Sequence, residues 1–107
     1  MSLQAFEKEI HSLDGLSDTE RTWFPKWVRR YSLSVRKGCV QDLTVNRQTA
    51  IRFSRTLLQC GAPAWQRWQA VRALACYRDL VLKRSEPDLS DVILTLARLG
   101  RSERNID

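Results

Sequence analysis

The sequence predicts an all-α protein, a small bundle of four or five helices. Apolar residues recur at spacings of three and four along most of the chain, as in helices that bury one side. No segment alternates apolar and polar residues for the length of a half-buried strand. A chain of 107 residues has room for a single hydrophobic core. Glycine and proline divide it into helix-sized pieces at Gly15, Gly38, Gly61, Pro63, Pro87 and Gly100.

The first two helices are predicted from apolar spacing and from one capping signal. Residues 3–13 place Leu3, Phe6, Ile10 and Leu13 on one side, which predicts a short amphipathic helix. The sequence SDTE at 17–20 is a capping box that predicts the start of a second helix, which Gly38 would end. Pro25 predicts a kink in this helix, or a start nearer Phe24.

The second helix has two contrasting faces. Its apolar face contains Trp23, Phe24, Trp27, Val28, Tyr31 and Val35. Its opposite face contains Thr22, Lys26, Arg29 and Arg36. We expect the aromatic side chains to pack in the core and the basic ones to face solvent.

The third helix is expected to begin after Thr44 as N-cap and to end near Gln59, with Gly61 as the C′ residue. Its predicted buried residues are Ala50, Ile51, Phe53, Leu57 and Leu58. Pro63 suits the first turn of a fourth helix, which we expect to continue to residue 84. A last helix carries apolar residues between Leu89 and Leu99 and is predicted to end at Gly100.

The fourth helix has a wide apolar arc and a narrow polar stripe, which is typical of a central helix surrounded by neighbours. The stripe contains Gln69, Arg72, Cys76, Asp79 and Lys83, with Trp65 at its head. Trp65 suits either stacking on a ligand or capping the core. Arg67 and Arg78 fall inside the apolar arc, so we expect them either to snorkel toward solvent or to pair internally.

The charge distribution is more informative than the net charge of +6. Residues 21–84 contain fourteen Lys and Arg residues but only two acids, Asp42 and Asp79, whereas both flanking segments are acidic. Such an excess repels itself and favours a polyanionic partner. The alternative is a basic face that serves solubility alone.

Several function classes lack their required residues. His11 is the only histidine and the three cysteines lack CxxC spacing, so neither a zinc site nor a Ser-His-Asp triad is expected. No glycine-rich phosphate loop is present. The chain is therefore not expected to be an enzyme or to hold a cofactor. It has no apolar run long enough for a membrane span and no signal peptide at its acidic start, so we expect a cytoplasmic protein.

Three segments resemble the N-terminal core-binding domain of tyrosine recombinases, the phage-integrase family, and within it the integron-integrase branch. They are Trp27-Val28-Arg29-Arg30-Tyr31, then Leu43-Thr44 followed by Phe53, Leu57 and Gly61, then Gln69-Ala70-Val71-Arg72-Ala73-Leu74 followed by Tyr77-Arg78. Two features depart from the family pattern: Pro25, and Trp65-Gln66 where the family has a Ser-Thr cap.

The resemblance implies a SAM-like, irregular helical array in which helices near 18–36 and 63–84 enter the major groove of duplex DNA. The residues it assigns to DNA contact are Thr22, Lys26, Arg29, Arg30, Gln66, Arg67, Gln69 and Arg72. Catalysis in this family belongs to a separate domain, so neither Tyr31 nor Tyr77 is expected to be the nucleophile. Residues 17–84 would be the core-binding domain, 1–16 an acidic segment with a short helix, and 85–107 a helix and tether toward the catalytic domain.

The sequence thus predicts a DNA-binding domain that acts in DNA integration and recombination. Its expected partners are double-stranded DNA and other recombinase protomers, and the isolated chain is expected to be monomeric. The alternative is a helical protein–protein interaction module with a basic face.

Overall fold

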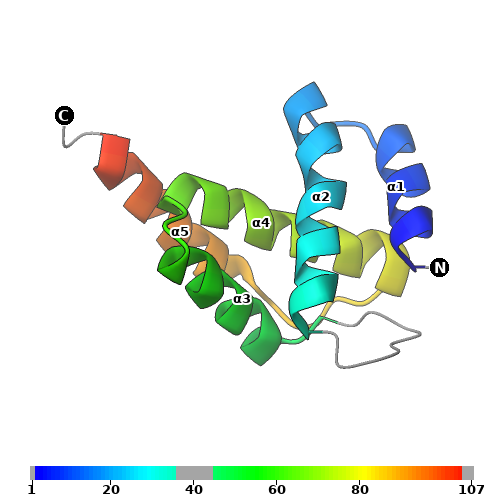
Figure 1. The fold of residues 1–107 in the computed structure, drawn as a ribbon. Helices are drawn as coiled ribbons and strands as arrows, with labels where there is room; N and C mark the ends of the chain where they lie inside the picture. The colour runs from blue at the N-terminus through cyan, green and yellow to red at the C-terminus, as the bar shows by residue number, and fades with distance from the viewer. Residues whose placement is uncertain (1, 36–44, 105–107) are drawn as a thin grey trace.

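The computed structural model describes residues 2–35 and 45–104 and confirms the all-α prediction. Its helices are α1 (Ser2–Ser12), α2 (Asp18–Val35), α3 (Arg47–Gln59), α4 (Ala64–Tyr77) and α5 (Ser90–Arg104) (Figure 1). A π-helical turn, η1 (Arg78–Leu82), continues α4. Within the described ranges no residue is in a strand. The predicted end of the second helix at Gly38 lies outside the described residues.

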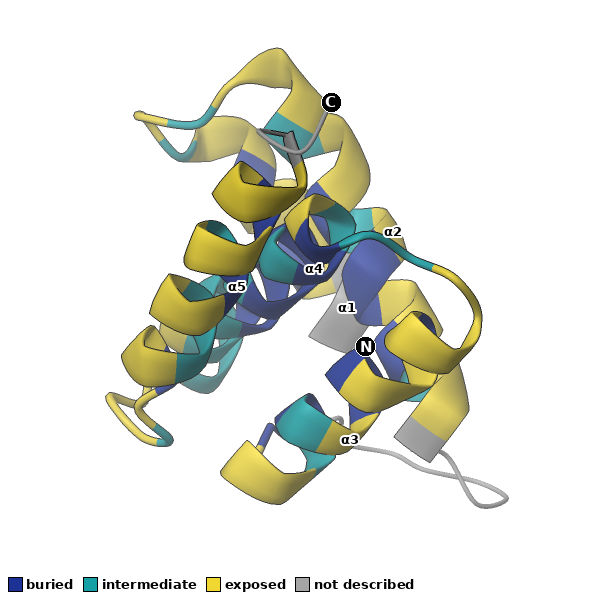
Figure 2. Cartoon of the chain, turned by 90° about the vertical axis from the view of Figure 1, so that its left-hand side faces the viewer, coloured by how far each residue is buried: buried dark blue, intermediate teal, exposed yellow. Residues whose placement is uncertain are grey.

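Helix α4 lies at the centre of the bundle. Helix α2 crosses it, α5 runs antiparallel along it, α3 packs against it, and α1 lies beside α2 and against η1 (Figure 1). Most of α4 is buried, whereas each of the other helices exposes one side (Figure 2). The central position predicted from its wide apolar arc is therefore confirmed.

One core joins all five helices. Its largest fully buried side chains are Tyr31, Tyr77, Phe6, Phe24, Ile10, Leu57, Leu74, Leu89, Val28 and Val71. Aromatic pairs tie distant segments together: Phe6 packs edge-to-face on Tyr77 with ring centroids 5.6 Å apart, and Tyr31 does the same with Phe53 at 5.5 Å. Helices α1 and α5 are thus parts of the same core as α2–α4.

Two side chains predicted to lie in the core are exposed, so that part of the prediction is wrong. Trp23 is 44 % exposed and Leu58 is 52 % exposed. Each lies on a helix of which only one side is covered by neighbours, and the apolar pattern of such a helix is wider than the covered side.

The start of α2 confirms the predicted capping box. The Ser17 hydroxyl accepts from the Glu20 amide at 3.1 Å, and the Glu20 carboxylate accepts from the Ser17 amide at 3.1 Å. The helix then continues through Pro25. The alternative of a start nearer Phe24 is wrong, because these two bonds satisfy backbone donors one turn earlier.

Helix α3 begins two residues later than predicted and ends as predicted. Its N-cap is Asn46 rather than Thr44; the Asn46 side chain accepts from the Thr49 amide at 2.9 Å. Gly61 has a φ of +89°, and the amides of Gly61 and Ala62 donate to the carbonyls of Leu58 and Leu57. This is a Schellman ending, and it requires the left-handed conformation that glycine adopts readily.

The predicted ends of the last two helices are wrong. Regular α4 ends at Tyr77, and Lys83, with a φ of 53°, closes the following π-helical turn. Helix α5 continues through Gly100, which is buried: a β-carbon there would lie 3.5 Å from Cα of Trp65. Glu103, beyond that glycine, accepts from the Ala64 amide at 2.9 Å and so caps the start of α4.

Candidate nucleic-acid interface

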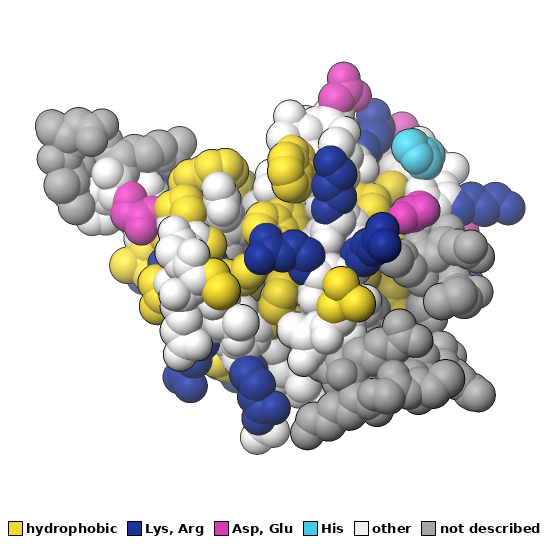
Figure 3. Space-filling view, in the orientation of Figure 1, with side chains coloured by type: hydrophobic (Ala, Val, Ile, Leu, Met, Phe, Trp, Pro, Cys, Tyr) yellow, Lys and Arg dark blue, Asp and Glu magenta, His cyan; other side chains and the backbone are white. Residues whose placement is uncertain are grey.

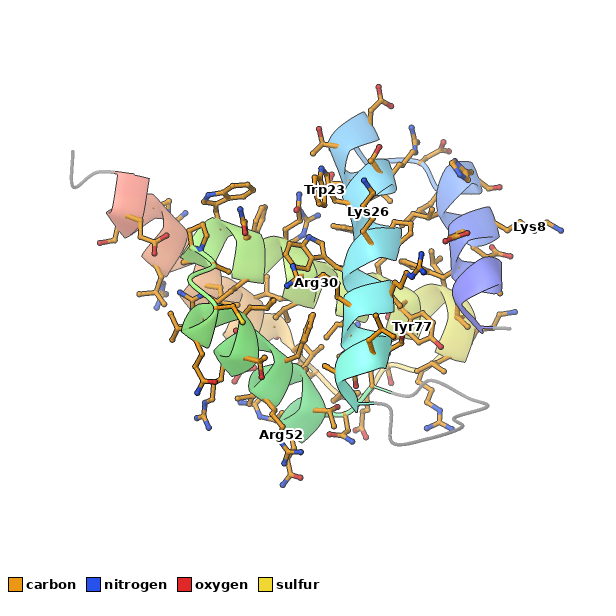
Figure 4. The ribbon with its side chains drawn as sticks, in the orientation of Figure 1. Lys8, Trp23, Lys26, Arg30, Arg52 and Tyr77 are labelled. Atoms are coloured by element: carbon orange, nitrogen blue, oxygen red, sulfur yellow. The ribbon has the colours of Figure 1, made fainter. Side chains whose placement is uncertain are left out.

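One side of α2 carries alternating aromatic and basic side chains. Lys26 Nζ lies 4.6 Å from the ring centroid of Trp23, and the guanidinium of Arg30 lies 5.1 Å from that of Trp27. The two indole rings are tilted against each other with centroids 6.4 Å apart. Figure 4 shows Trp23, Lys26 and Arg30 along successive turns of α2. These cation–π contacts restrain long side chains at the surface without neutralising them.

Three basic side chains of α2 lack an ionic partner among the described residues, whereas a fourth, Arg21, pairs with Asp18 at 3.7 Å. Lys26, Arg29 and Arg30 are exposed, and none of them forms a salt bridge with another described residue. Thr22 is exposed too, with its hydroxyl donating to the Asp18 carbonyl at 2.9 Å. All four α2 residues assigned by the resemblance are therefore accessible to a ligand.

The assigned residues of α4 are placed differently. Gln69, predicted on an exposed stripe, is only 9 % exposed, and its Oε1 accepts from Nε1 of Trp27 at 2.9 Å. The predicted exposure is wrong because α2 crosses α4 at this point and covers the stripe. Gln69 thus serves the α2–α4 interface by satisfying a buried indole N–H.

Arg67 is also part of the interior. It is 8 % exposed, and its Nε donates to the Ala62 carbonyl at 3.2 Å, so it has the internal pairing, one of the two arrangements expected from its place in the apolar arc. Arg78 also pairs internally, through the Pro87 carbonyl and Asp79. Gln66 is half-buried.

Arg72 is intermediate between the exposed cations of α2 and the buried Arg67 of α4. Its Nη1 is 2.5 Å from Oε2 of Glu20, and its guanidinium lies 4.7 Å from the ring centroid of Trp68 and 5.6 Å from that of Phe24. Partial burial raises the pKa of Glu20, but the hydrogen bonds from Ser17 and the charge of Arg72 outweigh it and leave the pKa below its ordinary value. Arg72 therefore carries a charge that is balanced within the protein.

We refer to six side chains as the basic–aromatic strip: Trp23, Lys26, Trp27 and Arg30 on α2, with Trp68 and Arg72 on α4. Figure 3 shows Lys and Arg side chains beside hydrophobic ones across the middle of this face. Apolar periodicity alone hides the strip, because it assigns Trp23 to the core. The i, i+3 spacing of Trp23 with Lys26 and of Trp27 with Arg30 is the sequence signal that identifies it.

The exposed cations of α3 lie apart from the strip. Arg52 and Arg55 border a shallow hollow with Gln48 and Ile51, and Figure 4 shows Arg52 on α3, away from Lys26 and Arg30. Arg47 instead makes two hydrogen bonds to Asp91 of α5, at 2.8 and 2.5 Å. This bond lowers the pKa of Asp91 to about 2.

A second surface feature is an open hollow of about 550 Å³ between α4 and α5. It is lined by Trp65, Trp68, Leu96, Ala97, Gly100 and Arg101. Trp65 is 48 % exposed at its edge. Its indole ring therefore remains partly accessible even though its backbone packs against Gly100.

Few groups in the structure suit covalent or metal chemistry. The described residues bring no three His, Cys, Asp or Glu side chains into a metal-binding group. Burial, with the charge of Asp79, raises the pKa of the Cys76 thiol to about 11, which keeps it protonated and unreactive at neutral pH. None of the helices in the described ranges has the length and apolarity to cross a bilayer.

No protein-family model matches the chain, and neither a curated protein nor a solved structure matches it. The resemblance to tyrosine recombinases therefore stays a prediction from the sequence motifs.

Proposed function

We propose that this chain is a duplex-DNA-binding domain of a site-specific recombinase of the tyrosine type. The observation that carries the proposal is the α2 side of the basic–aromatic strip, where Lys26 and Arg30 lie over tryptophan rings and form no salt bridge with any residue that the structure describes. An exposed, regularly spaced row of uncompensated cations on one helix suits the phosphates that border a DNA groove.

The proposed mechanism is phosphate neutralisation with limited contact to bases. Each Lys or Arg that neutralises a phosphate releases a condensed counterion, and this release supplies most of the affinity of a non-specific complex. Thr22 and Arg29 extend the accessible polar surface of α2. Gln69 and Arg67 would contribute indirectly, because their hydrogen bonds hold α4 and its neighbours in place.

A protein–protein interaction module is the second candidate, and the hollow between α4 and α5 is the observation that favours it. Its lining is mostly apolar, and Trp65 is half exposed at its edge. Large exposed aromatic residues are enriched at protein interfaces. Such a module would bind its partner without any requirement for DNA.

Fluorescence anisotropy with a labelled duplex of about 30 base pairs, at several salt concentrations, separates the two candidates. We expect a Kd on the order of 10⁻⁴ to 10⁻⁶ M near physiological salt if binding is non-specific, and a log–log salt slope of about −0.9 per phosphate contact. The double variant Lys26→Glu with Arg30→Glu should weaken binding about 100-fold or more, since it removes two contacts and adds repulsion.

The matched control is Arg52→Glu with Arg55→Glu, which makes the same charge change on α3. It should weaken binding far less, because only the long-range field of the protein changes. An equal loss in both variants would show that the strip is not the interface. No binding of the folded wild-type protein even at low salt would favour the interaction module.

A further inference from the structure

Arg72 is the one strip cation that already has an ionic partner among the described residues. Its guanidinium is held by Glu20 at 2.5 Å and by the rings of Trp68 and Phe24. The side chain of Arg72 is 31 % exposed and that of Glu20 is 16 % exposed, so the pair lies at the surface with the arginine outermost. Lys26 and Arg30 have no such carboxylate partner within residues 2–35 and 45–104.

Glu20 is fixed independently of Arg72. Its Oε1 accepts from the Ser17 amide at 3.1 Å, and its own amide donates to the Ser17 hydroxyl. These bonds belong to the cap of α2, which does not depend on a ligand. Any rearrangement of the pair would therefore move the long arginine side chain and leave the carboxylate in place.

The ring of Trp68 limits where the guanidinium of Arg72 could move. Its guanidinium has five donors, of which Glu20 engages one at hydrogen-bond distance. The Trp68 ring keeps the group at the edge of the strip, near the α2 crossing where Trp27 bonds to Gln69. A phosphate bound along Lys26 and Arg30 would thus meet a guanidinium whose charge is already balanced.

We infer that Glu20 competes with DNA phosphate for Arg72 and so sets the affinity of the strip below the value its cations would otherwise provide. This inference rests on the proposed DNA-binding function. In the free protein Glu20 holds Arg72; on DNA the guanidinium must either leave a partly buried carboxylate or share its charge between two anions. Either change costs free energy that phosphate binding by Lys26 and Arg30 does not require.

The substitution Glu20→Gln tests the competition with little change to the cap, because glutamine also serves at the third position of a capping box. Asp18→Asn is the matched control: it removes the same charge from the first turn of α2 at a fully exposed residue whose ionic partner is Arg21, at 3.7 Å, and not Arg72. We expect Glu20→Gln to bind the duplex about 5- to 10-fold more tightly than Asp18→Asn. Its log–log salt slope should be steeper by about 0.9, one additional phosphate contact.

The same experiment in an Arg72→Gln background isolates the effect of the Glu20–Arg72 ion pair on DNA binding. The advantage of Glu20→Gln over Asp18→Asn should disappear there, since there is no guanidinium to release. Arg72→Gln alone should weaken binding less than Arg30→Gln, because the charge of Arg72 is already balanced. This last comparison decides the question even if Glu20→Gln fails to fold, which circular dichroism and thermal melting would reveal.

Three results would overturn the inference. If Glu20→Gln and Asp18→Asn bind alike, Glu20 acts only through net charge. If Glu20→Gln binds more weakly than the control, Glu20 positions Arg72 for DNA instead of competing for it. If folded wild-type protein shows no binding to the duplex at low salt, the proposed function fails, and the inference fails with it.

Discussion

Lys26 and Arg30 on α2 lie in solvent above tryptophan rings, whereas Arg67 and Gln69 on α4 are buried and hydrogen-bonded inside the bundle. The two helices cross, and their polar side chains are of the same chemical kinds. They differ in how far neighbours cover them: α4 contacts α2, α3 and α5, whereas the side of α2 with Lys26 and Arg30 is exposed. Whether a polar side chain is buried or exposed therefore depends on the helix that packs over it.

Arg72 shows the boundary between the two regions. It lies on α4, close to the crossing, and is half-buried with a carboxylate and two rings around it. Its pairing with Glu20 resembles the internal pairing of Arg67, but its outer edge remains accessible like that of Arg30. The two regions thus differ in how far neighbouring helices bury their polar side chains, and substitutions can test this difference.

The largest expected effect is on α4. Gln69→Ala should lower the free energy of unfolding by about 1–3 kcal/mol, because the indole N–H of Trp27 would be buried without its acceptor. Chemical denaturation of both proteins measures this difference. Gln66→Ala, one turn earlier and half-buried, is the control and should remain within about 0.5 kcal/mol. Equal losses would mean that the Trp27–Gln69 bond does not distinguish the interior side of α4.

The opposite result is expected on α2. Arg30→Gln or Lys26→Gln should leave the free energy of unfolding within about 0.5 kcal/mol of wild type, as is usual for exposed positions. Each should instead weaken duplex binding about fivefold and reduce the magnitude of the salt slope by about 0.9. A marked loss of stability without a change in the slope would place these residues with Arg67 as structural.

A stabilising substitution is expected where α5 closes over α4. Gly100 lies inside α5, and a β-carbon there would make ordinary contacts of 3.5 Å with the Trp65 backbone. Gly100→Ala should therefore raise the free energy of unfolding by about 0.5–1 kcal/mol, since alanine loses less backbone entropy in a helix. A higher melting temperature would confirm that this side of α4 has room for a methyl group. A lower one would mean that the two helices are already in closest contact.

The smallest effect concerns an arginine paired at the surface. Arg47 lowers the pKa of Asp91 from its ordinary 3.8 to about 2, so the pair stabilises the fold fully above about pH 4 and loses this contribution as the pH falls toward 2. The melting temperature of Asp91→Asn should therefore lie slightly below that of wild type at pH 5–7. The two should converge near pH 2. A gap that persists at pH 2 would show that the asparagine disturbs α5 by another route.

Much of the fold is predictable from local signals. The capping box at Ser17, the Gly61 ending and the central place of α4 follow from sequence pattern, because each depends on residues within a few positions of one another. The errors in the predicted helix ends arise where contact with a segment distant in the sequence determines the structure. Gly100 does not end α5, since the helix packs on Trp65 and its Glu103 caps α4.

The candidate interface, too, was predictable in one part and not in another. The exposure of Lys26 and Arg29 was expected from the polar face of the second helix, whereas Arg30 was assigned only by the resemblance; all three are exposed. The burial of Gln69 was not expected. Helical periodicity defines the direction in which a side chain points, but it does not define whether another helix packs on that side. Trp23 shows the converse: a residue of core type remains exposed and holds Lys26.

The sequence by itself determined the all-α class, the concentration of basic charge between residues 21 and 84, and the cap that starts α2. These properties depend on composition and on contacts close in the chain. Only the tertiary structure decided which basic residues face solvent and that Glu20 holds Arg72, residues 52 positions apart. The physical reason is that burial and ion pairing depend on the crossing of α2 over α4, and that crossing is set by the packing of the whole core.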